Sequence, residues 1–210
     1  SQGLPARIER SATLIPTAGG EYGVMERFAK QFIDRIVAER NDYLLEMDAI
    51  GWNSLLDGKR LKGDMALSES KVVIKRAKAI VDKYEKRTAA LLEETRAQAN
   101  AVNLSKSNRK AFLTGFEEGL SESASQIDEL WMLEKHAVQQ FEKIILLLAS
   151  SKGWVVQGER ILFYRDDELD RFNTHVANIQ KIAQRQEQIQ TRNRAAALRR
   201  LESSKTALQR

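Results

Sequence analysis

The sequence predicts an all-α protein, an elongated up-down-up-down four-helix bundle with a small β-hairpin between the third and fourth helices. Only two of the 210 residues are proline, Pro5 and Pro16, so nothing beyond residue 20 forbids very long helices. Apolar residues recur at intervals of three and four over four long stretches, which is the spacing of amphipathic helices. Strand-like composition occurs in one short stretch, at about 154–164.

The chain divides into three regions by composition. Residues 1–20 carry both prolines and three glycines, and we expect an extended lead-in there. Residues 21–190 carry the apolar periodicity and are predicted to form the four-helix bundle domain. Residues 191–210 are predicted to be a basic helical tail, because the periodicity fades there among arginines. Short connections between the helices favour antiparallel neighbours.

The boundaries of the predicted elements follow from turn residues. Asp57-Gly58 is expected to end the first helix, and Gly153 follows the third. Gly158 lies in the turn of the hairpin, and Asp166 or Asp167 is expected to cap the fourth helix. The predicted helices cover about 21–57, 67–102, 107–151 and 166–190. In this topology the basic loop 58–64 and the hairpin lie together, at what we call the hairpin end of the bundle.

Several kinds of chemistry lack the residues they need. Without cysteine the chain can form no disulfide, thiolate metal site or cysteine nucleophile. Neither His136 nor His175 follows a glutamate three residues earlier, as a ferritin-type metal site requires. The sequence contains no P-loop and no Gly-x-Ser-x-Gly motif. We therefore expect no enzymatic activity, no cofactor and no metal, and we interpret His175 as a hydrogen-bonded core residue.

The apolar runs are too short for a membrane span. The longest, 144–149, falls far short of the roughly 20 residues that a spanning helix needs. Because the chain begins with Ser1 rather than methionine, a trimmed leader or lipid-bearing start is one expectation. We favour an exported, periplasmic protein of a bacterial envelope, with a cytoplasmic protein as the alternative.

One charged residue interrupts the most apolar helical face. Glu134 lies in the middle of the apolar arc of the third predicted helix, projected at about 100° per residue. Arg40 lies at the equivalent place in the first. Each lies 17 residues before the expected end of its helix, which places both about 25 Å from the hairpin end. We therefore predict a buried polar pair, Arg40 and Glu134, with further polar residues near that level: Tyr84, Thr88 and Gln186.

The pair allows three interpretations. A structural ion pair would set the register of the two helices, and removing one partner of such a pair costs about 3–5 kcal/mol. Alternatively, the two side chains extend to the bundle edge and keep their charges in water. The third interpretation is a ligand or proton site. We favour the structural pair.

Aromatic and basic residues gather at the predicted hairpin end. A surface that combines tryptophan with cationic side chains suits a protein partner or an anionic group. The alternative is that the aromatic residues only cap the core. The candidate partner surface comprises Trp52, Lys59, Arg60, Lys62 and Trp154.

Small residues lie on the core-facing arc of the third predicted helix. Gly115, Gly119 and Ser123 fall beside phenylalanine and leucine there. They indicate either the close approach of a neighbouring helix or an unfilled space. An unfilled space would be the pocket of a small-ligand sensor.

The C-terminal segment concentrates the positive charge. Residues 181–210 hold eight basic and two acidic side chains, a net charge of +6, whereas the remaining residues sum to −1. This segment is interpreted as a solvated helix end, as a contact for phosphates or an anionic membrane surface, or as a self-association contact through Leu198, Leu201 and Leu208. Nucleic acid is disfavoured as a partner, because the arginines hold to no single face and no aromatic residue interleaves them.

Three functions follow from these patterns. The leading hypothesis is a non-enzymatic interaction or scaffold protein that binds a protein partner or a second copy of itself. The first alternative is a helical sensor domain with its pocket at the small residues. The second alternative is a binder of nucleic acid or an anionic surface through the basic tail.

Overall fold

The computed structural model describes residues 19–151 and 153–208. It is mostly helical, with four long helices packed up-down and a two-stranded antiparallel hairpin before the last helix, so the predicted fold class is confirmed. The long helices are α1 (Gly20–Ala49), α3 (Ser68–Ala101), α4 (Lys106–Ser150) and α5 (Asp166–Leu208). The shorter elements are η1 (Trp52–Ser54), α2 (Gly58–Gly63), β1 (Trp154–Gln157) and β2 (Arg160–Phe163).

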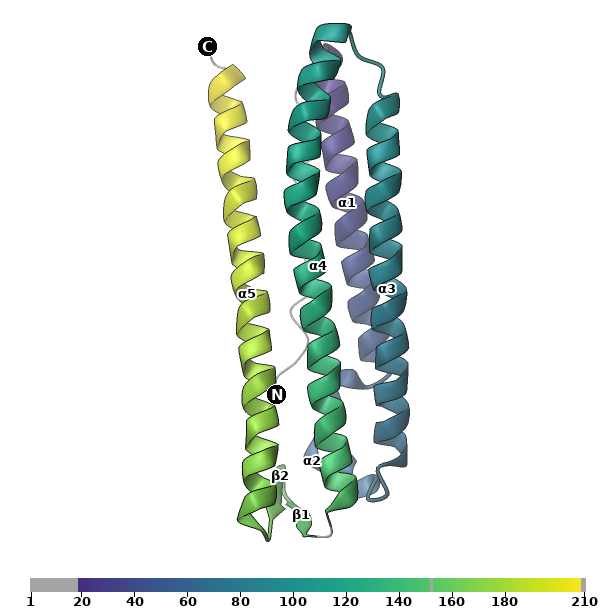
Figure 1. Cartoon of the computed structure of the whole chain (residues 1–210), viewed down its shortest axis with the longest axis vertical. Helices are drawn as coiled ribbons and strands as arrows, with labels where there is room; N and C mark the ends of the chain where they lie inside the picture. Colours follow the sequence, from purple (N-terminus) through teal and green to yellow (C-terminus); the bar gives the residue numbers. More distant parts are fainter. Residues whose placement is uncertain (1–18, 152, 209–210) are drawn as a thin grey trace.

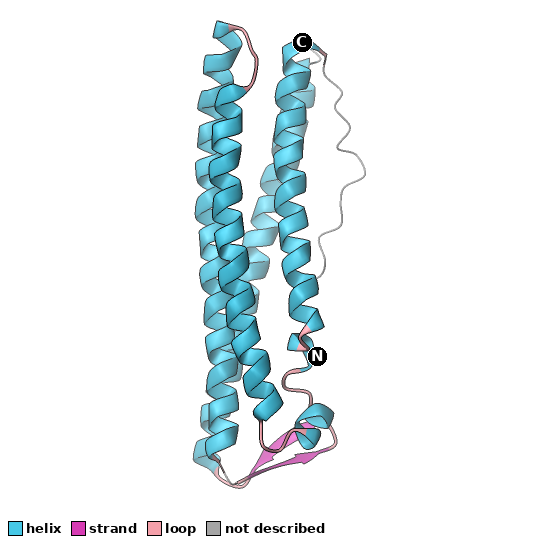
Figure 2. Cartoon of the chain, turned by 90° about the vertical axis from the view of Figure 1, so that its right-hand side faces the viewer, coloured by secondary structure: helices cyan, strands magenta, loops and turns pink. Residues whose placement is uncertain are grey.

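The long helices are arranged side by side in an elongated bundle (Figure 1). Helix α1 packs on α3, α3 packs on α4, and α4 packs on α5. The hairpin and α2 lie together and close one end of the bundle, and the α3–α4 connection lies at the other end (Figure 2). The predicted juxtaposition of the 58–64 segment with the hairpin is therefore present.

The first helix ends earlier than its predicted boundary. It was expected to continue to residue 57, but α1 ends at Ala49 and Gly51 adopts a left-handed conformation with φ of 79°. The segment 58–64, expected to be a loop, contains α2 instead. Asp57 explains this helix, because its carboxylate accepts a hydrogen bond from the backbone N–H of Arg60 at 3.1 Å.

The last helix includes the segment that was predicted as a basic helical tail. Helix α5 extends to Leu208, so the basic tail belongs to the same helix as the bundle segment. The arginines and leucines proposed for that tail beyond residue 193 have side chains outside the described residues. The expected lead-in at residues 1–18 also lies outside them.

The hairpin has the short turn that its glycine predicts. Trp154 pairs with Phe163, and Gln157 pairs with Arg160, which leaves a two-residue loop. Gly158 has a φ of 63° in that loop, a conformation that favours glycine.

The largest cluster of buried apolar side chains lies in the half of the bundle next to the hairpin. It includes fully buried residues from three segments, such as Met47 before η1, Leu61 of α2 and Ile144 of α4. The half away from the hairpin has a different composition. There α1 and α4 meet through aromatic rings that are only partly buried, with Phe28 5.8 Å from Phe112 and 5.3 Å from Phe116 between ring centroids.

Ion pairs connect neighbouring helices along the outside of the bundle. Most involve exposed side chains, and such pairs each contribute about 0–1 kcal/mol. Their positions along the chain nevertheless show which parts of neighbouring helices lie side by side. The pairs are Lys83–Glu46, Arg87–Glu39 and Arg35–Glu94 between α1 and α3, Lys78–Glu142, Lys135–Glu85 and Arg96–Glu117 between α3 and α4, and Arg185–Glu129 between α4 and α5.

Candidate functional site

Arg40 and Glu134 lie together, as the sequence predicts. Nη2 of Arg40 donates a hydrogen bond to Oε1 of Glu134 at 2.7 Å, and the Glu134 side chain is almost fully buried. The hydroxyl of Tyr43 donates to the other carboxylate oxygen at 2.8 Å. Both oxygens of Glu134 therefore have a donor, and both donors come from α1.

Aromatic rings surround this pair. Tyr43 meets Trp131 edge to face at 5.2 Å and Tyr84 at 5.7 Å between centroids, and the guanidinium of Arg40 lies 4.8 Å from the centre of the Tyr43 ring. Burial raises the pKa of Tyr43 well above its ordinary value, and the adjacent Glu134 carboxylate raises it further. Tyr43 is therefore a neutral hydrogen-bond donor over the whole physiological pH range.

The other residues expected at this level do not contact the carboxylate. Thr88 is buried and donates to the backbone carbonyl of Tyr84 at 2.7 Å. Burial raises the pKa of Tyr84 to about 12, with a contribution from its hydrogen bond to Glu46. Gln186 is buried, and its Nε2 has no hydrogen-bond partner among the described residues. The polar layer thus consists of Arg40, Tyr43 and Glu134, and the sequence reasoning did not assign Tyr43 to it.

The two tryptophans of the expected partner surface lie in the core. Trp52 and Trp154 are each 7% exposed. The Trp52 ring packs against Phe141 at 4.8 Å, and the indole N–H of Trp154 donates to the Leu148 carbonyl at 2.8 Å. Burial removes both indole rings from water, and the hydrogen bond to Leu148 satisfies the N–H of Trp154. These residues therefore close the core rather than form a surface.

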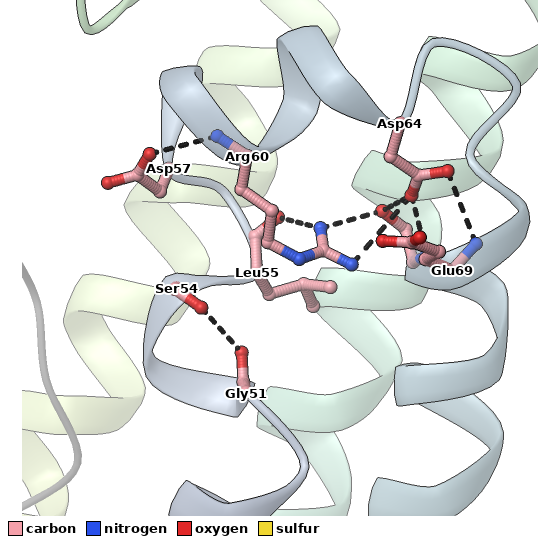
Figure 3. A network of polar contacts seen from close by, with 8 residues as sticks. Gly51, Ser54, Leu55, Asp57, Arg60, Asp64 and Glu69 are labelled. Atoms are coloured by element: carbon pink, nitrogen blue, oxygen red, sulfur yellow. Dashed lines mark hydrogen bonds and ion pairs between the residues drawn. The ribbon is translucent and has the colours of Figure 1, made fainter.

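Arg60 organises the segment around α2 (Figure 3). Its Nη1 donates to the Leu55 carbonyl at 3.1 Å and to the Ser70 hydroxyl at 2.9 Å, and its Nη2 lies 3.7 Å from Asp64. Asp64 accepts from the backbone N–H of Ser70 and Glu69 at the start of α3. Arg60 is therefore occupied by contacts within the protein.

Asp64 is a charged residue at a buried position. Burial alone would raise the pKa of its carboxyl group, but hydrogen bonds from the Ser70 side chain and backbone, the Glu69 N–H and the charge of Arg60 hold the pKa below its ordinary value. The carboxylate stays ionised and caps α3. Of the basic residues expected at this surface, Lys59 and Lys62 remain exposed.

Helix α2 and the hairpin are in close contact. A Cβ atom at Gly58 would lie 3.0 Å from two backbone atoms of Glu159, so only glycine allows this approach without displacement. Just outside the open end of the hairpin, the Tyr164 N–H donates to the Gly153 carbonyl at 2.7 Å, and the Ser151 hydroxyl donates to Glu168 of α5 at 2.5 Å. The two segments that flank the hairpin are thus joined to each other.

The surface of the hairpin end carries apolar side chains that sequence reasoning did not identify. In the described part of the chain ten large hydrophobic side chains are exposed, and six of them lie at this end. Tyr164, just after β2, is 74% exposed. The six are Met65, Val72, Leu146, Leu162, Tyr164 and Leu169. We call them the apolar end set.

The small residues of α4 are not pressed against a neighbour. No described atom lies within 4 Å of a Cβ placed at Gly115 or Gly119, and Gly115 is exposed. The Ser123 hydroxyl donates to the Gly119 carbonyl at 2.8 Å, one turn earlier in the same helix. The close approach of a neighbouring helix is therefore not present at either glycine.

A groove of about 220 Å³ lies between α3 and α4 near the hairpin end. Its floor is apolar and its edges carry three lysines and one glutamate. The residues that line it are Lys71, Ile74, Lys75, Lys78, Glu142, Ile145 and Leu146. The sequence reasoning identified no site in this part of the chain.

His175 is hydrogen-bonded as expected, but it is only partly buried rather than a core residue. Its Nδ1 lies 2.9 Å from Oε1 of Gln140 on α4. Burial lowers the pKa of His175, and the positive charges of Lys143 and Arg171 lower it further. This hydrogen bond joins α5 to α4.

Comparison with protein-family models, with curated proteins and with solved structures gives no match. Within residues 19–151 and 153–208, no three histidine, cysteine, aspartate or glutamate side chains lie close enough together to hold a metal ion. No helix of that part of the chain is long and apolar enough to cross a membrane.

Proposed function

We propose that the protein is a non-enzymatic interaction module that binds a protein partner through its hairpin end. The apolar end set carries this proposal, because most of the exposed large hydrophobic side chains of the described chain gather there. Single exposed apolar residues are ordinary on protein surfaces, whereas their concentration in one region is typical of an interaction surface.

The hydrogen bonds that order the hairpin end support the same proposal. The Arg60 network fixes the segment from Leu55 to Ser70, and the Trp154 indole fixes the hairpin to the end of α4. A surface that is ordered before binding loses less conformational entropy when a partner docks. The hairpin end thus offers both apolar side chains and a preformed shape.

Two exposed tyrosines at opposite ends of the bundle give a matched test. Tyr164 belongs to the apolar end set, whereas Tyr22 of α1 is 65% exposed at the other end. A photo-cross-linking phenylalanine analogue would replace either residue in the full chain, expressed in its native cells. We expect a discrete cross-linked product from position 164 and none from position 22.

The mass of the product identifies the occupant. A product of twice the 23.9 kDa chain mass would assign the surface to self-association, which is also an interaction function. Cross-linking from position 22 alone, or from neither position, would contradict binding through the hairpin end.

A further inference from the structure

We infer that the groove between α3 and α4 receives an acidic amphipathic segment of a protein partner, with an apolar side chain on the groove floor and carboxylates against the lysines. This inference rests on the proposed function and names the chemistry of the partner. The groove lies at the same end of the bundle as the apolar end set, and two of its features select the occupant.

The first feature is the shape of the groove. Ile74 and Ile145 are buried and form its floor, and Leu146, which is 54% exposed, forms part of its edge. The volume of about 220 Å³ is below the roughly 300–1,000 Å³ of sites that enclose whole small molecules. A groove of this size between two helices suits the apolar side chain of a docked helix or extended segment.

The second feature is its charge. Lys78 has both oxygens of Glu142 within 2.7 Å, so these two charges offset each other. Lys71 and Lys75 are exposed and form no ion pair with any residue in the described ranges. They follow one another by four residues, about 6 Å along one face of α3. The open part of the groove therefore has a positive edge that complements a carboxylate-bearing partner.

Helix stability does not account for Lys71. It lies in the first turn of α3, where the helix dipole disfavours a positive charge. The same reasoning makes charge reversal structurally safe. Glutamate at position 71 would favour the helix, and position 75 is an exposed helical site. A loss of binding in Lys71→Glu/Lys75→Glu would therefore report on the groove rather than on folding.

A random-sequence peptide library displayed on phage provides the probe. The library would be selected on the full chain, and the peptide that is most enriched would be synthesised and titrated by fluorescence anisotropy. We expect enriched sequences with carboxylates on both sides of an apolar residue. Binding to Lys71→Glu/Lys75→Glu should weaken by about tenfold or more, because like charges then face each other.

Lys106→Glu/Lys110→Glu is the matched control. It makes the same change of charge at two exposed lysines that are also four residues apart, at the start of α4 and at the end of the bundle away from the hairpin. The control should bind the peptide as the unmodified chain does. Circular dichroism and the urea midpoint would verify that both double variants are folded.

Three outcomes would overturn the inference. The first is enrichment of neutral or basic peptides, and the second is equal affinity of the peptide for the two double variants. In the third, no peptide is enriched, but the chain binds dodecanoate and Lys71→Glu/Lys75→Glu does not. That result would assign the groove to an anionic lipid. If the cross-link at position 164 still forms, the proposed function stands and only the groove assignment falls.

Discussion

Glu134 shows how a charge is accommodated at a single buried position. Its two oxygens accept from Arg40 and Tyr43, and both donors lie one helical turn apart on α1. The pair therefore links α1 to α4 at one height, although these helices are not adjacent in sequence. Buried ion pairs add little net stability compared with apolar residues, but an unpaired charge left in the core is costly.

The pair gives the first prediction. Arg40→Met should lower the free energy of unfolding by about 3–5 kcal/mol, because it leaves the buried Glu134 carboxylate without its cation. Glu134→Leu should cost a similar amount. The double variant should recover most of the loss, and urea unfolding measures all three.

The exposed pair of Lys78 and Glu142 serves as the comparison. It also joins two helices, but its side chains are 47% and 34% exposed, so its removal should cost about 0–1 kcal/mol. If the double variant at positions 40 and 134 is no more stable than either single variant, the two residues do not act as a pair.

His175 predicts a loss of stability in mild acid. Burial lowers its pKa in the folded protein below the ordinary value of 6.5, so the unfolded chain binds more protons between the two pKa values. Stability therefore rises with pH in that window and falls as the pH drops below about 6.5. His175→Gln should remove this part of the pH dependence.

Urea unfolding at several pH values measures the effect of His175. His136→Gln is the control, because His136 is exposed on α4. An unchanged pH dependence in His175→Gln would contradict a neutral, hydrogen-bonded His175.

The sequence predicts the pairing of Arg40 with Glu134 but not the hydrogen bond from Tyr43 that completes the layer. Counting residues from the helix ends places the two charges at one height even though the first helix ends at residue 49. The early end of the first helix does not change this height, because η1 and α2 occupy the space between the end of α1 and the hairpin end of the bundle. Tyr43 was not predicted, because its position among apolar residues indicates only that its ring is packed. In the structure the ring packs against Trp131 and the hydroxyl also donates to Glu134.

Among the elements, α2 and the hairpin form one unit. Neither would be stable alone, since α2 has six residues and the hairpin has two strands. Leu61 of α2 and Trp154 of β1 both belong to the core cluster, and Gly58 brings the two backbones together. Their mutual packing stabilises the segment that carries the exposed apolar residues.

The close approach at Gly58 gives a further prediction. Gly58→Ala should destabilise the protein by about 1–3 kcal/mol, because the new methyl group would press on the backbone of Glu159. Gly63→Ala, at the other end of α2, should be neutral or stabilising by up to about 1 kcal/mol, since nothing described lies within 4 Å and alanine favours helix. Thermal unfolding measures both. Equal effects of the two substitutions would show that α2 and the hairpin are not tightly packed.

Glycine positions explain which element boundaries could be predicted. Gly158 is correctly predicted in the hairpin turn, because a glycine between two short apolar runs is typical of a β-hairpin turn. Gly51 and Gly58 are ambiguous, because either could end the first helix. The structure assigns the left-handed conformation to Gly51, whereas Gly58 opens α2. The cap at Asp57 and the tertiary contact with Glu159 both favour Gly58 as the start of α2.

The whole molecule is asymmetric along its length. The core cluster and the apolar end set both lie toward the hairpin, whereas α1 from 24 to 41 has only partly buried or exposed side chains. The four long helices follow from apolar periodicity and the scarcity of proline. The location of the proposed partner surface does not follow from these patterns. The same residue types, tryptophan in particular, can either close a core or contact a partner.

Hydrogen exchange of the whole chain tests most directly the claim that the hairpin end is the rigid, preformed end. Backbone amides of 43–49 and 138–148 should exchange most slowly, because they pack in the core cluster. Amides of 24–37 and 108–119, near the partly buried aromatic rings, should exchange faster. Equal protection of the two halves, or slower exchange at the end away from the hairpin, would contradict the account.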